Sequence, residues 1–371
     1  MILQTSKVKR RRRENVARLI DFYGPAYRKP GGAKYRAKFF AEDGVKHLAY
    51  PVVSYDEMGK KFSAKEQLLN QKDYGLGLNL DLIINPTDNP DVFWVEAMEY
   101  GPVTICGKTG EFHGRSMNLF RFEEGKIKLW REYATKFPVR RILDETGENQ
   151  PWCPKERRGD PGQMFPIPEE MRTEWDTKPN PHLVLKDAPV KTEDGMTTRV
   201  YVVDDACDDS VEADIRRVEN LHTVYSHFGP KVRMPRGGEI NNRFFSERGL
   251  GTFDFMLEDY GQGKWQLIYD AGKEDGMGLP ANWNMDTKAV YLTPDPNVFW
   301  AEKRLIPLQK DNFSEVDEND YFQHYVMYFK FDDAGKILLF REFADQENEY
   351  LSMGYPVSKL PEEAEAFIRG M

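Results

Sequence analysis

Two glutamates in a motif that occurs twice are the strongest candidates for chemistry in this sequence. Glu132 follows Trp130 at the alternating spacing of a strand, and Glu342 follows Phe340 in the same way. Alternating residues share one face of a strand. A carboxyl group among apolar neighbours loses hydration, which raises its pKa toward the pH at which it can transfer protons. The alternative is that the preceding arginines mark an exposed edge and the glutamates pair with surface lysines.

Further candidates lie on the strand before each glutamate. His324 and Tyr328 alternate in YFQHYVMYFKF and so share a face, where His324 would be an acid/base group. The counterpart of His324 in the first half of the chain is Arg115, with His113 two residues earlier. In a pocket, a guanidinium binds a carboxylate or phenolate through two parallel hydrogen bonds. For His113 a turn is the simpler interpretation, and His227, on an expected helix, is interpreted as a core or surface residue.

The motifs that are missing narrow the class of chemistry. The sequence has no Walker loop, no dinucleotide-binding G-x-G-x-x-G after a strand, no G-x-S-x-G elbow and no H-E-x-x-H. Its three cysteines are scattered, which predicts neither a zinc site nor a disulfide framework. We therefore expect no cofactor and no metal. Aromatic residues near the candidates, Trp130 and Phe340 among them, suit a flat ring as substrate, although most aromatic residues here are expected in the core.

Four blocks of sequence occur twice in the same order, which predicts a duplicated domain. The matched blocks are 11–25 with 216–230, 39–44 with 244–249, 89–96 with 295–302, and 122–134 with 331–344. We expect a first domain over 1–150, a linker over 151–207 and a second domain over 208–371. Two short apolar stretches, His182 to Leu185 and Thr198 to Val203, predict a hairpin within the linker that packs on one domain.

Each copy begins with helices and ends with strands. The apolar residues Val16, Leu19 and Tyr23 recur at helical spacing before Gly24-Pro, and Ser63 with Glu66 forms a capping-box pattern. The second half of each copy is rich in β-branched and aromatic residues around Gly-containing turns, typical of an antiparallel meander. This order predicts an α+β fold in which a curved sheet wraps around helices and leaves a pocket at one end.

Bulk properties exclude several partners. The net charge of −9 argues against general nucleic-acid binding, and the basic run Lys7 to Arg13 is interpreted as the solvated start of a helix. No apolar run approaches the roughly 20 residues of a membrane span, and no signal peptide is apparent. We expect a cytoplasmic protein with a small aromatic substrate, no nucleic-acid partner and no membrane partner.

The order of a helix, FFAEDG, NPDVFWVE and G-K-I-x-x-x-R-E resembles the phenazine biosynthesis A/B proteins, within the nuclear transport factor 2-like (SnoaL-like) superfamily. The resemblance implies two tandem cone-shaped α+β barrels. It also implies an internal pseudo-dimer. Whether the chain forms homo-oligomers beyond this pseudo-dimer stays open, since further pairing is common for symmetric folds. The family's acid/base glutamate falls on Glu132 and Glu342, and the family counterpart of His324 is also a histidine. Both copies lack a second family histidine, so the fold transfers better than the reaction.

Three functions remain open from the sequence. The first is a cofactor-independent acid/base lyase acting on an aromatic small molecule, with deformylation of a lignin-derived diaryl dimer as its specific form. The second is a phenazine-type condensing enzyme or isomerase acting on cyclic amino-ketones. The third is a non-catalytic small-molecule-binding protein. If Glu132 and Glu342 both face bulk water, the enzyme hypotheses lose their main support.

Overall fold

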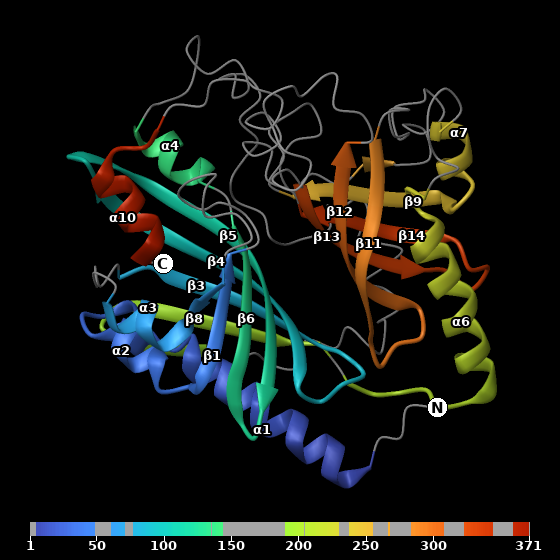
Figure 1. Cartoon of the computed structure of the whole chain (residues 1–371), viewed down its shortest axis with the longest axis horizontal. Helices are drawn as coiled ribbons and strands as arrows, with labels where there is room; N and C mark the ends of the chain where they lie inside the picture. Colours follow the sequence, from blue (N-terminus) through green and yellow to red (C-terminus); the bar gives the residue numbers. More distant parts are fainter. Residues whose placement is uncertain are drawn as a thin grey trace. The chain divides into compact units, whose positions relative to one another are not determined.

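The chain forms two compact units, each built around its own sheet. The computed structural model describes residues 5–48, 61–70, 77–134, 136–143, 190–203, 205–229, 237–254, 266–267, 283–307, 323–343 and 359–370. Helices and strands occur in both units, so the predicted α+β class is confirmed (Figure 1).

The N-terminal unit opens with helices and continues into long strands. Its elements are α1 (Ser6–Phe22), η1 (Pro25–Arg28), α2 (Gly32–Ala37), β1 (Phe40–Leu48), β2 (Lys61–Ser63), α3 (Ala64–Asn70), β3 (Asn79–Pro86), β4 (Val92–Ile105), β5 (Lys108–Glu123), β6 (Lys126–Ala134) and α4 (Phe137–Leu143). The strand order is β2-β1-β6-β5-β4-β3, in which only the β1–β6 pair is parallel. The predicted cap of α3 is present, because the Glu66 backbone N–H donates to Ser63 Oγ at 3.4 Å.

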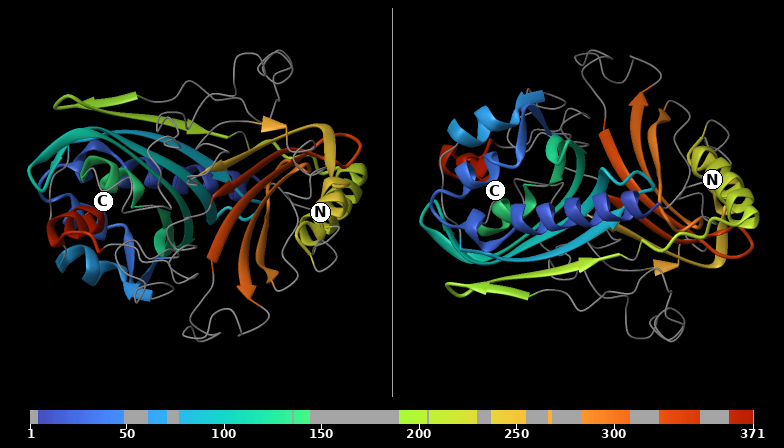
Figure 2. Two further views of the ribbon diagram at one scale, coloured as in Figure 1. Left: turned by 90° about the horizontal axis from the view of Figure 1, so that it is seen from above. Right: turned by 90° about the horizontal axis from the view of Figure 1, so that it is seen from below.

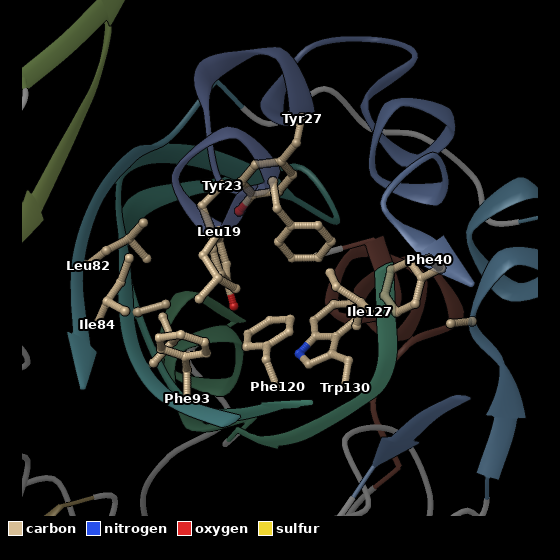
Figure 3. Close-up of a cluster of buried hydrophobic side chains, with 14 of the residues drawn as sticks. Leu19, Tyr23, Tyr27, Phe40, Leu82, Ile84, Phe93, Phe120, Ile127 and Trp130 are labelled. Atoms are coloured by element: carbon tan, nitrogen blue, oxygen red, sulfur yellow. The ribbon is translucent and has the colours of Figure 1, made fainter. Parts of the chain in front are cut away.

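The core of this unit lies between α1 and the concave face of the sheet. Figures 1 and 2 show α1 running along the curved sheet, and Figure 3 shows the side chains that fill the space between them. Phe22 of α1 contacts the rings of Phe120 and Trp130, with centroids 5.4 and 5.5 Å apart. All three residues are buried in one apolar cluster, and burial of such large side chains is the main stabilising contribution.

Two segments from later in the chain complete the N-terminal unit. Within the predicted linker, β7 (Val190–Glu193) and β8 (Met196–Val202) form a hairpin, and β8 extends the sheet beside β3 (Figure 2). The second strand matches the predicted stretch Thr198 to Val203, but its hairpin partner is β7 and not the stretch that we expected. The stretch from His182 to Leu185 lies outside the described residues. Helix α10 (Glu362–Gly370) also belongs to this unit, although we expected the second domain to run from 208 to 371. Its apolar residues, including Phe367, pack against Phe112 of β5.

The C-terminal unit repeats the same plan. Its elements are α6 (Val211–Ser226), α7 (Gly237–Asn242), β9 (Phe245–Asp254), β10 (Gln266–Leu267), β11 (Trp283–Leu292), β12 (Val298–Pro307), β13 (Gln323–Phe331) and β14 (Ile337–Phe343). The order β10-β9-β14-β13-β12-β11 matches the six strands β2-β1-β6-β5-β4-β3 of the N-terminal sheet, which β8 and β7 extend further. Among the six strands of the C-terminal sheet, only the β9–β14 pair is parallel, as only β1–β6 is among the matching six.

Several of the repeated sequence blocks have structural roles that are the same in both units. Asn15 Nδ2 donates to the carbonyl oxygen of Pro90 at 3.1 Å, and Asn220 Nδ2 donates to that of Pro296 at 3.3 Å. These bonds join the first helix to the turn before the NPDVFWVE-type strand. Gly44 is the last residue of the FFAEDG block. A side chain does not fit at this position, because an added Cβ would lie 2.9 Å from the Ile127 carbonyl oxygen. Much of the repeat is therefore conserved between the copies by the fold itself.

Candidate functional site

A buried ion pair lies in the interior of the N-terminal unit. Lys46 of β1 and Glu132 of β6 are joined by a 2.8 Å contact between Nζ and Oε2. Glu132 is 9% exposed, so it does not face bulk water. Lys46 Nζ also lies 3.9 Å from the ring centroid of Trp130, which is a cation–π contact. The two residues are partners in the register of β1 and β6, so they lie on the same face of the sheet. Burial lowers the pKa of Lys46, and Glu132 partly offsets this.

A second cation lies among the aromatic rings of the same interior. The guanidinium of Arg36, from α2, is 4.3 Å from the ring centroid of Phe22, 4.4 Å from that of Tyr27 and 4.5 Å from that of Trp130. Burial lowers its pKa to about 10, so Arg36 stays charged at neutral pH. Figure 3 shows Tyr27 on the helical side of this interior and Trp130 on the sheet side. The site thus combines positive charge with flat apolar surfaces.

A second carboxyl group faces the ion pair across the sheet. Glu99 of β4 pairs in register with the core residue Leu80, which places it on the concave face. Burial, with a smaller contribution from the charge of Glu132, raises the pKa of Glu99 to about 8. Burial also raises the pKa of the Tyr23 hydroxyl well above its usual value. At neutral pH the interior therefore offers one carboxyl group that holds its proton beside one that is paired with a lysine.

The C-terminal unit buries its motif glutamate next to a different lysine. Glu342 of β14 is 5% exposed, and it lies opposite Met327 in the sheet register. Lys303 of β12 is 1% exposed, and burial lowers its pKa to about 7 while Glu342 opposes that shift. Lys303 Nζ donates to the carbonyl oxygens of Val224 and His227, at 2.8 and 2.5 Å, at the end of α6.

An imidazole lies in the middle of this second interior. The ring of His227 is surrounded by those of Phe228, Phe245, Phe329 and Phe340, with centroids 4.3, 5.6, 5.2 and 5.0 Å away. Burial, and then the charge of Lys303, lowers the pKa of His227 well below 6.5. His227 is therefore a neutral imidazole, a core position that the sequence allowed but to which it gave no role.

The strand register separates the candidates that the sequence placed in the second domain. Phe340 pairs with Phe329 and Glu342 with Met327, so these four residues lie on the inner face. Tyr328 pairs with Arg341 and Trp300 on the opposite face, where its ring contacts Trp300 at 5.0 Å between centroids. His324 shares the face of Tyr328, as predicted, but that face is not the one of Glu342.

In the first domain, Trp130 and Glu132 lie on the same face of β6. The other two candidates, Arg115 and His113, lie on the neighbouring strand β5. Arg115 lies opposite Met98 and His113 opposite Tyr100, on either side of the Gly114–Glu99 pair. The side chains of Arg115 and His113 lie outside the described part of the structure. His113 is part of the long strand β5, and the turn that we considered simpler is not there.

The site residues that the sequence analysis missed are Arg36, Lys46, Glu99 and Lys303. Glu99 and Lys303 have a signal in the alternation of their strands. Glu99 follows the buried Val95 and Ala97 at every second position, and Lys303 follows Phe299 and Ala301. A charged residue that continues an inward-facing series points into the core.

Among the described residues, no group of three or more histidine, cysteine, aspartate or glutamate side chains is placed to hold a metal ion. Within the same residues, no helix has both the length and the apolar character required to cross a membrane.

Comparisons with known proteins give similarity in structure only. No protein-family model and no curated protein matches the chain. It is similar to a phenazine biosynthesis-related protein from Pseudomonas aeruginosa, at 22% identity and a TM-score of 0.28, over 37% of this chain and 88% of that one. It is also similar to a nuclear transport factor 2-like protein from Burkholderia thailandensis, at 14% identity and a TM-score of 0.27, over 35% and 96%.

A third similar structure is an epoxide hydrolase/cyclase-like enzyme of pyran-ring formation in the polyether salinomycin, at 16% identity and a TM-score of 0.24, over 35% of this chain and 94% of that one. Each match covers most of the chain of the similar protein but only about a third of this chain. The chain thus has two α+β units with separate mixed sheets, and nuclear transport factor 2-like proteins are among the structures to which it is similar.

Proposed function

We propose that the N-terminal unit is an acid/base lyase site for an aromatic small molecule. The observation that carries this proposal is the buried Lys46–Glu132 ion pair against Trp130, with Glu99 as a second carboxyl group on the same concave face. A buried ion pair is a weak source of stability, because desolvation offsets much of the attraction between the charges. The cluster is better explained by chemistry that needs charges in a water-poor interior.

The two carboxyl groups divide the acid and base roles. Glu99, whose pKa is raised to about 8, is mostly protonated at pH 7 and donates a proton. Glu132, whose Oε2 lies 2.8 Å from Lys46 Nζ, accepts one. Two carboxyl groups in unlike surroundings, one paired with a cation and one with a raised pKa, are a recurrent arrangement for proton transfer in enzymes.

The cations stabilise the anion that forms after proton removal. Lys46 Nζ and the Arg36 guanidinium both lie within 4.5 Å of the Trp130 ring centroid, so an aryl group packed on Trp130 would have both cations near its oxygen substituents. An oxyanion or phenolate in such an interior gains more from these charges than it would in water.

The specific reaction that we propose is loss of formaldehyde from a hydroxymethyl group of a lignin-derived diaryl dimer. Glu132 takes the hydroxyl proton, the carbon–carbon bond breaks, and formaldehyde leaves. The electron pair of the broken bond then takes the proton of Glu99. Every atom is accounted for in this step, since the dimer loses CH₂O and gains no other group.

The test is release of formaldehyde from hydroxymethyl-bearing diaryl dimers by the whole chain, with formaldehyde and the shortened dimer both quantified by mass spectrometry. We expect Glu132→Gln to lower kcat by roughly 10²–10⁴-fold, as removal of a general base does. Glu342→Gln, the same change in the other copy of the motif, is the matched control and leaves kcat within about two-fold. Binding of the dimers without turnover would overturn the lyase and support a binding protein. Equal loss in the two variants would overturn the assignment to one unit.

A further inference from the structure

The interior of the C-terminal unit holds ionisable groups that the proposed lyase does not use. Lys303, His227 and Glu342 come from β12, the end of α6 and β14, and all three are buried. The rings of Phe329 and Phe340 contact that of His227. No negatively charged oxygen lies within salt-bridge distance of Lys303 Nζ in the described residues; its hydrogen-bond partners are two backbone carbonyls.

The hydrogen bonds of Lys303 leave one direction open at the nitrogen. A neutral primary amine has two N–H groups and one lone pair. The carbonyl oxygens of Val224 and His227 accept both N–H groups. The lone pair then points away from the end of α6 and is available to a proton or to an electrophilic carbon. Burial favours this neutral form, since it lowers the pKa of Lys303 to about 7.

The imidazole of His227 supplies a second observation. Both ring nitrogens are fully buried, and neither has a hydrogen-bond partner among the described residues. An unpaired buried donor or acceptor loses its hydration without replacement, so such groups are rare in proteins unless a ligand or a water completes them. The capping of α6 accounts for the hydrogen bonds of Lys303, but it does not account for a polar ring at this position.

We propose that the interior of the C-terminal unit is a separate site for an aromatic aldehyde or ketone, in which Lys303 Nζ forms an imine with the carbonyl carbon. The amine adds to the carbonyl group to give a carbinolamine. That intermediate loses water as the C=N bond forms, so one aldehyde and one amine yield one imine and one water molecule. The N–H of neutral His227 donates a hydrogen bond to the carbonyl oxygen, and the four phenylalanine rings around His227 pack on the aryl group.

Reductive trapping tests this site directly. The whole chain is incubated with benzaldehyde and cyanoborohydride at pH 7, digested and mapped by mass spectrometry. We expect a benzyl adduct on Lys303 at least ten-fold above that on the median surface lysine, because surface amines stay protonated at this pH. The labelling rate of Lys303 should rise through a pH of about 7 and then level off.

Two variants separate an imine site from a merely structural lysine. Lys303→Arg keeps donors for the α6 carbonyl groups but cannot form an imine, so it should fold and lose the adduct. His227→Phe should fold and lower the labelling rate several-fold. Glu132→Gln should label like the wild type, which keeps this result independent of the lyase. Labelling of Lys303 only after denaturation, or no faster than at surface lysines, would overturn the proposal.

Discussion

The two units place the same glutamate in the same strand but bring the lysine to it from different strands. In the N-terminal unit Lys46 comes from β1 and is paired in register with Trp130. In the C-terminal unit Gly251 of β9 pairs with Phe340 at that position, and the lysine is Lys303 of β12. The fold thus fixes the carboxylate, whereas the position of the cation changes between copies.

The change of strand alters what each lysine does. Lys46 contacts the carboxylate directly, at 2.8 Å, whereas Lys303 donates to backbone carbonyls at the end of a helix. The first interior is therefore suited to proton transfer between carboxyl groups. The second, with a neutral amine and a neutral imidazole among phenylalanine rings, is suited to carbonyl chemistry.

Removing each lysine should have unequal effects on stability. Lys46→Met leaves Glu132 buried without its partner, which typically costs about 3–5 kcal/mol. Lys303→Met removes two hydrogen bonds but also a buried amine, so we expect a loss of about 1 kcal/mol at pH 9. Urea unfolding, with hydrogen exchange to locate the weakened unit, measures both. Equal losses would show that the two lysines have the same role.

The pH dependence of stability provides the control for this comparison. The pKa of Lys303 is about 10.5 when unfolded and about 7 when folded, so the unfolded chain binds more protons between these values. The unfolding free energy of the wild type should therefore rise with pH from about 7 to 10.5 through this group. Lys303→Met should remove that rise, and an unchanged slope in the variant would contradict the burial of a neutral amine.

The second prediction concerns Glu99, which has no acidic counterpart, because Leu305 occupies the equivalent place in β12. As a proton donor with a pKa of about 8, Glu99 is active below that pH, so the lyase rate should fall as pH rises through 8. Glu99→Gln should lower kcat by about 100-fold and remove this limb of the pH–rate profile. A profile that keeps the limb in the variant would assign the acid to another group.

The fold could be predicted from the sequence because of the repeat. The blocks that recur are those that the fold needs in both units, such as Asn15 and Asn220 at the helix-to-turn contact and Gly44 at the close approach to Ile127. Glu132 and Glu342 recur in the same way, and the prediction that they are buried follows from the alternation of apolar residues in their strands.

The cations could not be found from the repeat, because they do not recur. In the C-terminal unit, Gly251 occupies the position equivalent to Lys46. In the N-terminal unit, Ala97 occupies the position equivalent to Lys303. The face that His324 occupies was also not predicted. Strand β13 has apolar residues on both faces, Val326 on that of His324 and Met327 with Phe329 on the other, so alternation alone does not decide which face of this strand is inside. Packing of α6 against the sheet decides that question, and it is a tertiary property.

The smallest predicted effect concerns His227, because the N-terminal unit has Phe22 at the equivalent position. Phe22 sits among the same kinds of rings, with Phe40, Phe120 and Trp130 around it, and it brings no polar atoms. His227→Phe should therefore stabilise the C-terminal unit by about 1–2 kcal/mol, because it removes ring nitrogens that have no partner in the described residues. Thermal unfolding without added aldehyde measures this gain. The gain should shrink when a carbonyl ligand is present, because only the wild-type imidazole can donate a hydrogen bond to the ligand's carbonyl oxygen. A destabilised variant would mean that the imidazole is already satisfied and that the two interiors are less different than their rings suggest.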